Sequence, residues 1–158
     1  MIFQSPASHL DPLMRIGDQV GQTLRRHRGL SGKALAEEVV RLLDQVRIPD
    51  PRRWADAWPH ELSGGMKQRA MIAGALACEP DVLIADEPTT ALDATVQKGV
   101  LDLLNSLRAD RGLAMIFVSH DLGAVARVCD RLLVMRNGEV VEEGTVNRIV
   151  TALSLIHI

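Results

Sequence analysis

The sequence predicts an α/β fold in which helices pack on a parallel sheet. Two short runs, residues 82–85 and 114–118, are followed by polar or acidic residues, and a helical pattern lies between them. Both runs are entirely apolar, which predicts strands that are buried on both faces. Strands and helices alternate in this way in parallel sheets, and such sheets bind ligands beyond the carboxyl ends of their strands.

The first half of the chain is expected to be helical. Apolar residues recur at every fourth position between Ile16 and Leu24, which is typical of one face of a helix. Ser31 is expected to be the N-cap of a second helix. The apolar stripe of that helix comprises Leu35, Val39, Leu42, Leu43 and Val46. Residues 50–59 are interpreted as a connection containing two tryptophans, and a third helix is expected over residues 65–78.

The second half is expected to contain the sheet. Asp93 is a plausible N-cap for the helix that joins the two apolar runs. After the second run, a further helix should extend to about Cys129. The Asn137-Gly138 pair then predicts a hairpin between strands 132–135 and 139–142, because this dipeptide suits a tight turn with positive φ angles.

The composition is that of an ordinary globular domain. The 158 residues are 47% apolar and 24% charged. A net charge of -2 argues against a general nucleic-acid binder, which usually carries a basic excess. Cys78 and Cys129 do not form a CxxC pair, so neither a disulfide nor a zinc site is expected, and a reducing cytosol is favoured. The apolar runs are too short to cross a bilayer.

Two adjacent carboxylates, Asp86 and Glu87, follow the first apolar run. Their charges are costly to place there unless something pairs with them. At the end of a strand the two side chains can take separate tasks. One can hold Mg²⁺ through its waters, and the other can orient or deprotonate an attacking water. The alternative is a helix-capping turn before Pro88, and the pair alone does not decide between the two.

Three further groups are candidates for binding phosphate. Residues 63–65, Ser-Gly-Gly, stand at a helix start, where backbone N–H groups and the helix dipole favour an anion; the alternative is a turn with a serine cap. His120 follows the second apolar run and could donate to a phosphate oxygen or be an ordinary core histidine. Gln4 could coordinate a cation, hold a water or lie in a loop.

Taken in chain order, these groups resemble the nucleotide-binding subunit of ATP-binding cassette (ABC) transporters over residues 1–152. The matching segments are the Q-loop at Gln4, the signature motif at 62–66, the Walker B strand at 83–86, the D-loop at Ala91-Leu92-Asp93 and the switch histidine at His120. The resemblance implies a P-loop NTPase-type fold that binds ATP and Mg²⁺.

The resemblance also implies a role for each site residue. Glu87 and His120 are implied to be catalytic, and Asp86 and Gln4 to hold the metal. The implied nucleotide-binding residues are Gln4, Ser63, Gly64, Gly65, Gln68 and Asp93.

Finer features indicate a subgroup of the family. Residues 59–69 and 86–93 resemble the oligopeptide, dipeptide and nickel importers, as do residues 13–17 and 120–123. This resemblance implies a peripheral subunit on the cytoplasmic face of the cell membrane, with no nucleic-acid partner. Its implied partners are a second ATP-binding subunit, transmembrane permease subunits and, indirectly, a substrate-binding protein. It leaves open whether the cargo is peptide or nickel, and whether the dimer is homomeric or heteromeric.

The Walker A loop of the family, GxxxxGK[ST], does not occur in these 158 residues, so we expect a partial domain. Residues 12–78 are expected to form a helical signature subdomain and residues 80–152 the core from Walker B to the switch histidine. Residues 153–158 fit nothing in the family and are interpreted as a translated library adapter. About three charge-assisted hydrogen bonds of roughly 1.5–3 kcal/mol barely offset the roughly 4–15 kcal/mol cost of association. Alone, the chain is therefore expected neither to bind nor to hydrolyse ATP appreciably.

Other readings remain open. A DNA-repair or chromosome-maintenance ATPase of the same superfamily shares the signature and Walker B, but residues 11–58 show neither heptads nor cysteine pairs. A helicase could contain the acidic pair, but residues 62–69 would then be unexplained. A non-catalytic piece that offers its signature to another subunit is the non-enzyme alternative.

Overall fold

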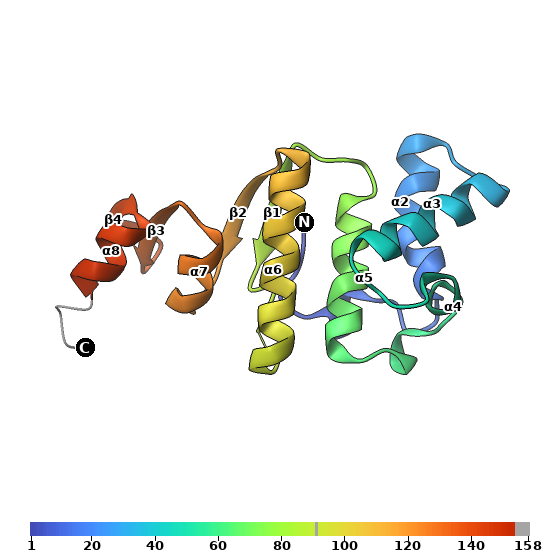
Figure 1. The fold of residues 1–158 in the computed structure, drawn as a ribbon, viewed down its shortest axis with the longest axis horizontal. Coiled ribbons are helices and arrows are strands. Elements are labelled where there is room, and N and C mark those ends of the chain that lie inside the picture. The colour runs from blue at the N-terminus through green and yellow to red at the C-terminus, as the bar shows by residue number, and fades with distance from the viewer. Residues whose placement is uncertain (91, 154–158) are drawn as a thin grey trace.

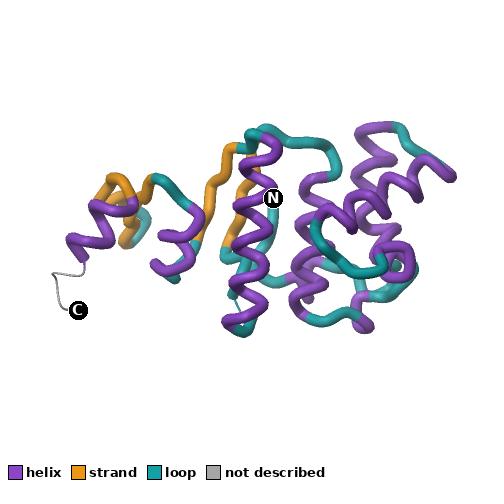
Figure 2. Tube along the Cα trace, viewed as in Figure 1, coloured by secondary structure: helices purple, strands orange, loops and turns teal. Residues whose placement is uncertain are grey.

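The computed structural model describes residues 1–90 and 92–153 and confirms the α/β prediction. Its parts follow one another along the long axis of the molecule (Figures 1 and 2). Helices from residues 16–76 lie at one end, two parallel strands and a long helix lie in the middle, and a hairpin with a final helix lies at the other end. The predicted D-loop residue Ala91 and the tail residues 154–158 lie outside the described residues.

The first part is a helical unit. Its elements are α1 (Pro6–His9), α2 (Ile16–Arg28), α3 (Gly32–Gln45), α4 (Pro51–Ala55), the 3₁₀ helix η1 (Pro59–Glu61) and α5 (Gly64–Leu76). The connection expected at residues 50–59 is therefore partly helical. Pro51 occupies the first turn of α4, where a missing N–H costs nothing. Ser31 is the N-cap of α3, as predicted, although its side chain makes no capping hydrogen bond.

The middle of the molecule is a small parallel sheet. Strand β1 (Val82–Asp86) pairs in parallel with β2 (Ala114–Val118), with Asp86 opposite Val118. The long helix α6 (Ala94–Arg111) connects them. Ile2 lies along the other edge of β1, where its N–H donates to the Ile84 oxygen at 2.8 Å and its oxygen accepts from the Asp86 N–H at 3.0 Å. This pairing brings the N-terminal segment next to the acidic end of β1.

Helix α7 (Leu122–Val128) leads from the sheet to the hairpin of β3 (Arg131–Arg136) and β4 (Glu139–Thr145), which is followed by α8 (Val146–Leu153). The two turn residues have positive φ angles, 52° at Asn137 and 83° at Gly138. Asparagine and glycine tolerate this conformation, so the hairpin predicted from this pair is confirmed.

The prediction that β1 and β2 are buried on both faces is wrong for the described chain. Along β1, Leu83 and Ala85 are buried, whereas Val82 and Ile84 are exposed. Ile116 and Val118 of β2 are likewise exposed. The physical reason is that the helices cover one face of the sheet, and no described element covers the other.

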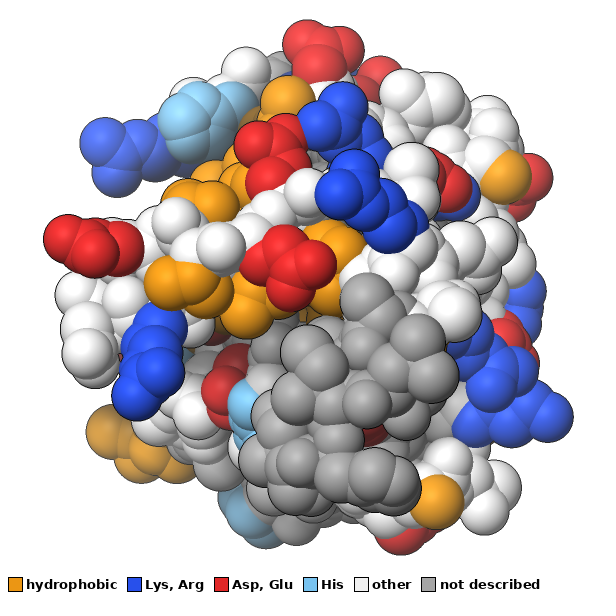
Figure 3. All heavy atoms as spheres, turned by 90° about the vertical axis from the view of Figure 1, so that its left-hand side faces the viewer, with side chains coloured by type: hydrophobic (Ala, Val, Ile, Leu, Met, Phe, Trp, Pro, Cys, Tyr) orange, Lys and Arg blue, Asp and Glu red, His pale blue; other side chains and the backbone are white. Residues whose placement is uncertain are grey.

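An open groove of about 660 Å³ separates β2 from β3. Side chains from both strands and from α7 line it, including Ile116, Val125 and Leu133. Further apolar side chains of the hairpin are exposed, and at this end of the molecule hydrophobic side chains reach the surface between charged ones (Figure 3). The hairpin residues concerned are Leu133, Met135, Val140 and Val141.

Candidate nucleotide site

The candidate site lies at the carboxyl ends of β1 and β2. Asp86 ends β1, and Glu87 follows it with a φ angle of 43°, a left-handed conformation that is strained for a residue other than glycine. The Glu87 N–H donates to the Val118 oxygen at 2.9 Å. This bond ties the acidic turn to the end of β2, two residues before His120.

The Glu87 carboxylate has three side-chain partners. Gln4 Nε2 and Thr90 Oγ1 donate to its Oε2 at 2.8 and 2.9 Å, and His120 Nδ1 lies 2.9 Å from Oε1. Three segments that are distant in sequence therefore meet at one carboxylate. The structure thus brings together the predicted site residues Gln4, Glu87 and His120.

These contacts change the acidity of both ionisable groups. The hydrogen bond from His120 is the main cause that lowers the pKa of Glu87, with Thr90 and Gln4 adding to it. In turn, Glu87 raises the pKa of His120 above its ordinary value of 6.5, and Asp121 adds a smaller contribution. The His120 side chain is 72% exposed, so solvent screens this attraction. Both shifts favour the ionised pair, so Glu87 stays a carboxylate that can accept hydrogen bonds.

Asp86 and Gln4 were predicted to hold Mg²⁺, and their donor atoms fit that ion. Gln4 uses its amide nitrogen on Glu87, which leaves its amide oxygen as an acceptor. Mg²⁺ prefers oxygen ligands and keeps several waters, so one carboxylate, one amide oxygen and a phosphate suffice. Among residues 1–90 and 92–153, no group of three or more His, Cys, Asp or Glu side chains is arranged to hold a metal by itself.

The Ser-Gly-Gly segment forms the start of α5, as predicted. Ser63 is its N-cap, and its hydroxyl accepts from the Met66 N–H at 3.3 Å. Gly65 packs so closely on Val96 of α6 that a Cβ atom there would lie 2.5 Å from the valine Cγ1. A Cβ atom added at Gly64 would lie 3.7 Å from its nearest neighbour, Leu92 Cδ2. This segment therefore adjoins the start of α6, and the described contacts do not link it to Glu87.

Of two other predicted nucleotide contacts, Asp93 caps a helix and Gln68 is buried. Asp93 caps α6, where its Oδ1 accepts from the N–H groups of Thr95 and Val96 at 3.1 and 2.9 Å. Gln68 is only 1% exposed, and its Nε2 has no hydrogen-bond partner among the described residues. An external nucleotide does not reach a side chain that is buried in this way, so a direct contact by Gln68 is not supported.

Sequence reasoning missed three residues of the site. Thr90 lies three residues after Glu87, the carboxylate to which it donates. A hydroxyl at this spacing could have predicted the hydrogen bond from the sequence. Gln97 and Asp121 form a 2.8 Å hydrogen bond between α6 and the loop that carries His120. Because 24 residues separate them, no local pattern indicates that pair.

The length and apolar character of the described helices decide whether any of them could cross a membrane. None of the helices within residues 1–90 and 92–153 combines the length and the apolar character that a membrane span needs.

Known proteins share this fold and sequence. The chain is 54% identical over 149 residues to a putative peptide import ATP-binding protein of Brucella ovis, which covers 94% of this chain and 44% of that protein. It is 50% identical over 149 residues to the glutathione import ATP-binding protein GsiA of Salmonella typhi, covering 94% and 24% of the two chains. The chain thus spans less than half the length of these curated relatives.

Solved structures give the same picture. The ATP-binding cassette MJ0796, in a dimeric post-hydrolysis state bound to ADP and Pi, superposes with a TM-score of 0.77 at 30% identity, over 92% of this chain and 62% of that chain. CbiO1 of Clostridium perfringens, part of the ABC transporter complex cbiONQ, superposes with a TM-score of 0.82 at 29% identity, over 98% and 59%. The family model described as ABC transporter matches residues 1–90. The chain belongs to the ABC transporter family.

Proposed function

We propose that this chain is part of the ATP-binding and ATP-hydrolysing subunit of an ABC importer. The single observation that carries the proposal is the meeting of Gln4, Glu87 and His120 at the ends of β1 and β2. Relatives that are named as import ATP-binding proteins support the direction of transport. Their names also favour peptides as the class of cargo over nickel.

The geometry supports a division of tasks. Glu87, kept ionised by its partners, would polarise the attacking water. His120 and Gln4 would exchange their bonds to this carboxylate for bonds to the γ-phosphate when nucleotide arrives. Asp86 and the Gln4 oxygen would hold the Mg²⁺ that accompanies ATP. Thr90 would keep its bond to Glu87 and so preserve the carboxylate orientation while the other two partners move.

The site needs groups that this chain does not contain. A loop with the GxxxxGK[ST] pattern, which cradles the phosphates, is absent from the 158 residues and would come from another part of the complete subunit. The exposed face of β1 and β2, and the groove between β2 and β3, are apolar surfaces on which such a part would pack. The proposal keeps the division into a helical signature subdomain, residues 12–78, and a core, residues 80–152.

Ser63, Gly64 and Gly65 are proposed to face the nucleotide of a second ATP-binding subunit, because they adjoin α6 and do not contact Glu87. The dimeric MJ0796 cassette supports pairing of this kind. In this arrangement each subunit would supply one part of two sites, and the 158-residue chain alone would show no appreciable turnover.

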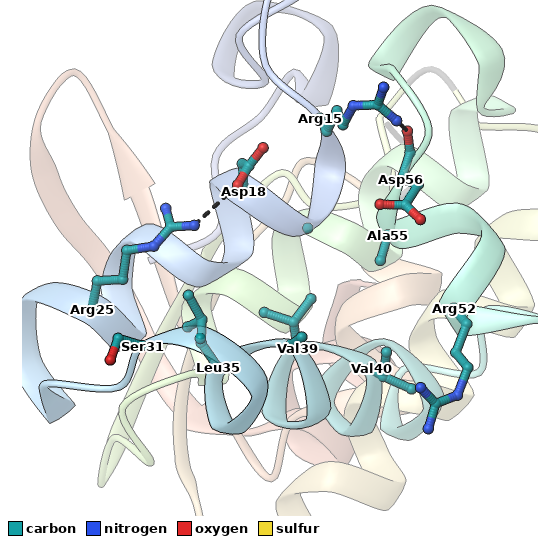
Figure 4. A pocket seen from close by; sticks show the side chains of 13 residues that line it. Arg15, Asp18, Arg25, Ser31, Leu35, Val39, Val40, Arg52, Ala55 and Asp56 are labelled. Atoms are coloured by element: carbon teal, nitrogen blue, oxygen red, sulfur yellow. Dashed lines mark hydrogen bonds and ion pairs between the residues drawn. The ribbon is translucent and has the colours of Figure 1, made fainter.

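The membrane partner is proposed to contact the helical unit. Helices α2, α3 and α4 enclose a cavity of about 440 Å³ whose floor includes Leu35, Val39 and Val40 (Figure 4). Charged side chains surround this floor; Arg25 pairs with Asp18 at 3.0 Å, and Arg15 donates to the backbone oxygen of Asp56. An apolar floor with a charged rim suits an amphipathic segment of a permease subunit. This contact would place the chain at the cytoplasmic face of the membrane, with the substrate-binding protein as an indirect partner. The rim comprises Arg15, Asp18, Arg25, Arg52 and Asp56.

The test uses the complete subunit assembled with its permease in liposomes. Glu87→Gln keeps the shape of the side chain and removes its charge, so we expect ATP to bind and turnover to be lost. Glu139→Gln makes the same chemical change on the exposed strand β4 and should leave turnover unchanged. Full turnover by the Glu87 variant would contradict the proposal.

A further inference from the structure

The first turn of α6 touches two separate parts of the candidate site through consecutive residues. Val96 packs on Gly65 at the start of α5. Next to it, Gln97 Nε2 donates to Asp121 Oδ2 at 2.8 Å in a partly buried hydrogen bond. The start of α6 is therefore in contact both with α5, here called the signature helix because the signature motif begins it, and with the loop that carries His120.

Asp121 is the anchor of that loop. Its second oxygen, Oδ1, accepts from the N–H groups of Gly123 and Ala124 at 2.8 and 3.2 Å and so caps α7. Its own N–H donates to Ser119 Oγ at 3.0 Å. The hydrogen bond from Gln97 is the main cause that lowers the pKa of Asp121, so this anchor is ionised and accepts strongly. Asp121, one neighbour of His120, is thus held to α6 and α7 through its carboxylate, and it contacts Ser119, the other neighbour, through its backbone N–H.

His120 itself is poorly held. Its side chain is 72% exposed, and its described side-chain contact is the bond to Glu87. An exposed pair of this kind contributes little and does not fix an imidazole by itself. The orientation of the ring therefore depends on the backbone of residues 119–121, which the bond from Gln97 ties to α6.

We propose that Gln97 is a positioning residue for His120, and that it links the start of α6, and with it the signature helix, to the histidine. When a nucleotide moves the start of α5, Val96 and Gln97 would transmit that movement to the loop. The role of His120 at the phosphate rests on the proposed function. The hydrogen bond between Gln97 and Asp121, here called the clamp, does not depend on ATP.

Three variants test the clamp. Gln97→Met removes the donor and keeps the length of the side chain, whereas Gln97→Lys keeps a donor for Asp121 and should rescue. The matched control is Asn105→Leu, because Asn105 Nδ2 donates to the Arg127 oxygen at 3.0 Å. That bond also starts from α6, two turns beyond Gln97, but it ends on Arg127 within α7 and not on the loop that carries His120.

The first readout is backbone order of residues 119–121, measured by NMR relaxation on the 158-residue chain without nucleotide. We expect order parameters of about 0.85 in the parent, in Gln97→Lys and in Asn105→Leu, and values below about 0.6 in Gln97→Met. Unchanged order in Gln97→Met, or the same loss in Asn105→Leu, would overturn the clamp.

The second readout is ATP hydrolysis by the complete subunit carrying the same substitutions. Loss of one positioning hydrogen bond should lower kcat roughly fivefold in Gln97→Met. KM should stay within about twofold, because the nucleotide contacts remain. Loss of loop order with an unchanged kcat would overturn the link to the reaction. The Glu87→Gln experiment separately decides whether the proposed function holds, so the two failures are distinguishable.

Discussion

Replacing Gly65 by alanine should destabilise the chain, because the new methyl group would have no room. Its Cβ would lie 2.5 Å from Val96 Cγ1, which is 0.9 Å shorter than the 3.4 Å at which ordinary contact begins. Val96 is β-branched and lies in a helix, so its side chain has one strongly preferred rotamer and yields poorly. Overpacking of this kind costs about 1–3 kcal/mol.

An opposing effect must be subtracted. Alanine is favoured over glycine in a helix interior by up to about 1 kcal/mol. Gly74 lies in the same helix, and a Cβ there would have no atom within 4 Å. Gly74→Ala should therefore stabilise the chain by roughly 0.5–1 kcal/mol. Gly65→Ala should instead lower the free energy of unfolding, by up to about 2.5 kcal/mol once the gain in propensity is subtracted from the clash.

Urea denaturation of the 158-residue chain measures both variants, and a double-mutant cycle isolates the clash. Val96→Ala removes Cγ1 but leaves Cβ, which would lie at an acceptable 3.8 Å. In that background Gly65→Ala should become harmless, which gives a coupling energy of about 1–3 kcal/mol. A coupling energy near zero, or a Gly65→Ala variant as stable as Gly74→Ala, would refute the reasoning.

Three other predictions follow from the described contacts. Histidine NMR should find that His120 titrates above 6.5 and that Glu87→Gln brings its pKa back down. The stability that this pair adds is complete below pH 6.5 while Glu87 stays ionised, and it is lost as the pH rises through the raised pKa of His120 or falls through the lowered pKa of Glu87. Asp93→Ala should cost about 1 kcal/mol of unfolding free energy because it loses two capping bonds, whereas Ser31→Ala should change it by less than about 0.5 kcal/mol; equal costs would contradict this contrast. Leu104→Ala, at a core position with 0% exposure, should cost about 2–5 kcal/mol in the same assay, and a loss well under that range would show that the site collapses around the cavity.

The sequence predicted the elements whose signals are local. The Asn137-Gly138 turn and the Asp93 cap depend on residues within a few positions, and the structure has both as expected. Residues 50–59 were interpreted as a connection, yet Pro51 begins α4, because proline suits the first turn of a helix. Ser31 had the right residue type and an extended backbone, but residue type does not determine where its hydroxyl points.

Long-range features were predicted less well. An apolar strand such as residues 82–85 indicates burial, but its sequence does not say which segments do the covering. The grouping of Gln4, Glu87 and His120 could be predicted only because each stood near a strand end or belonged to a family pattern. Gln97 had neither signal, since its partner lies on another element and becomes visible only when the chain is folded.

Within the described residues, β2 pairs with β1 and β3 pairs with β4, so β2 and β3 each have one edge without a partner strand. Unpaired backbone N–H and C=O groups on an edge recruit strands from other molecules, and apolar side chains nearby strengthen such contacts. The chain made by itself should therefore self-associate as its concentration rises. Light scattering would detect that growth, and a lysine introduced at Ile116 should suppress it.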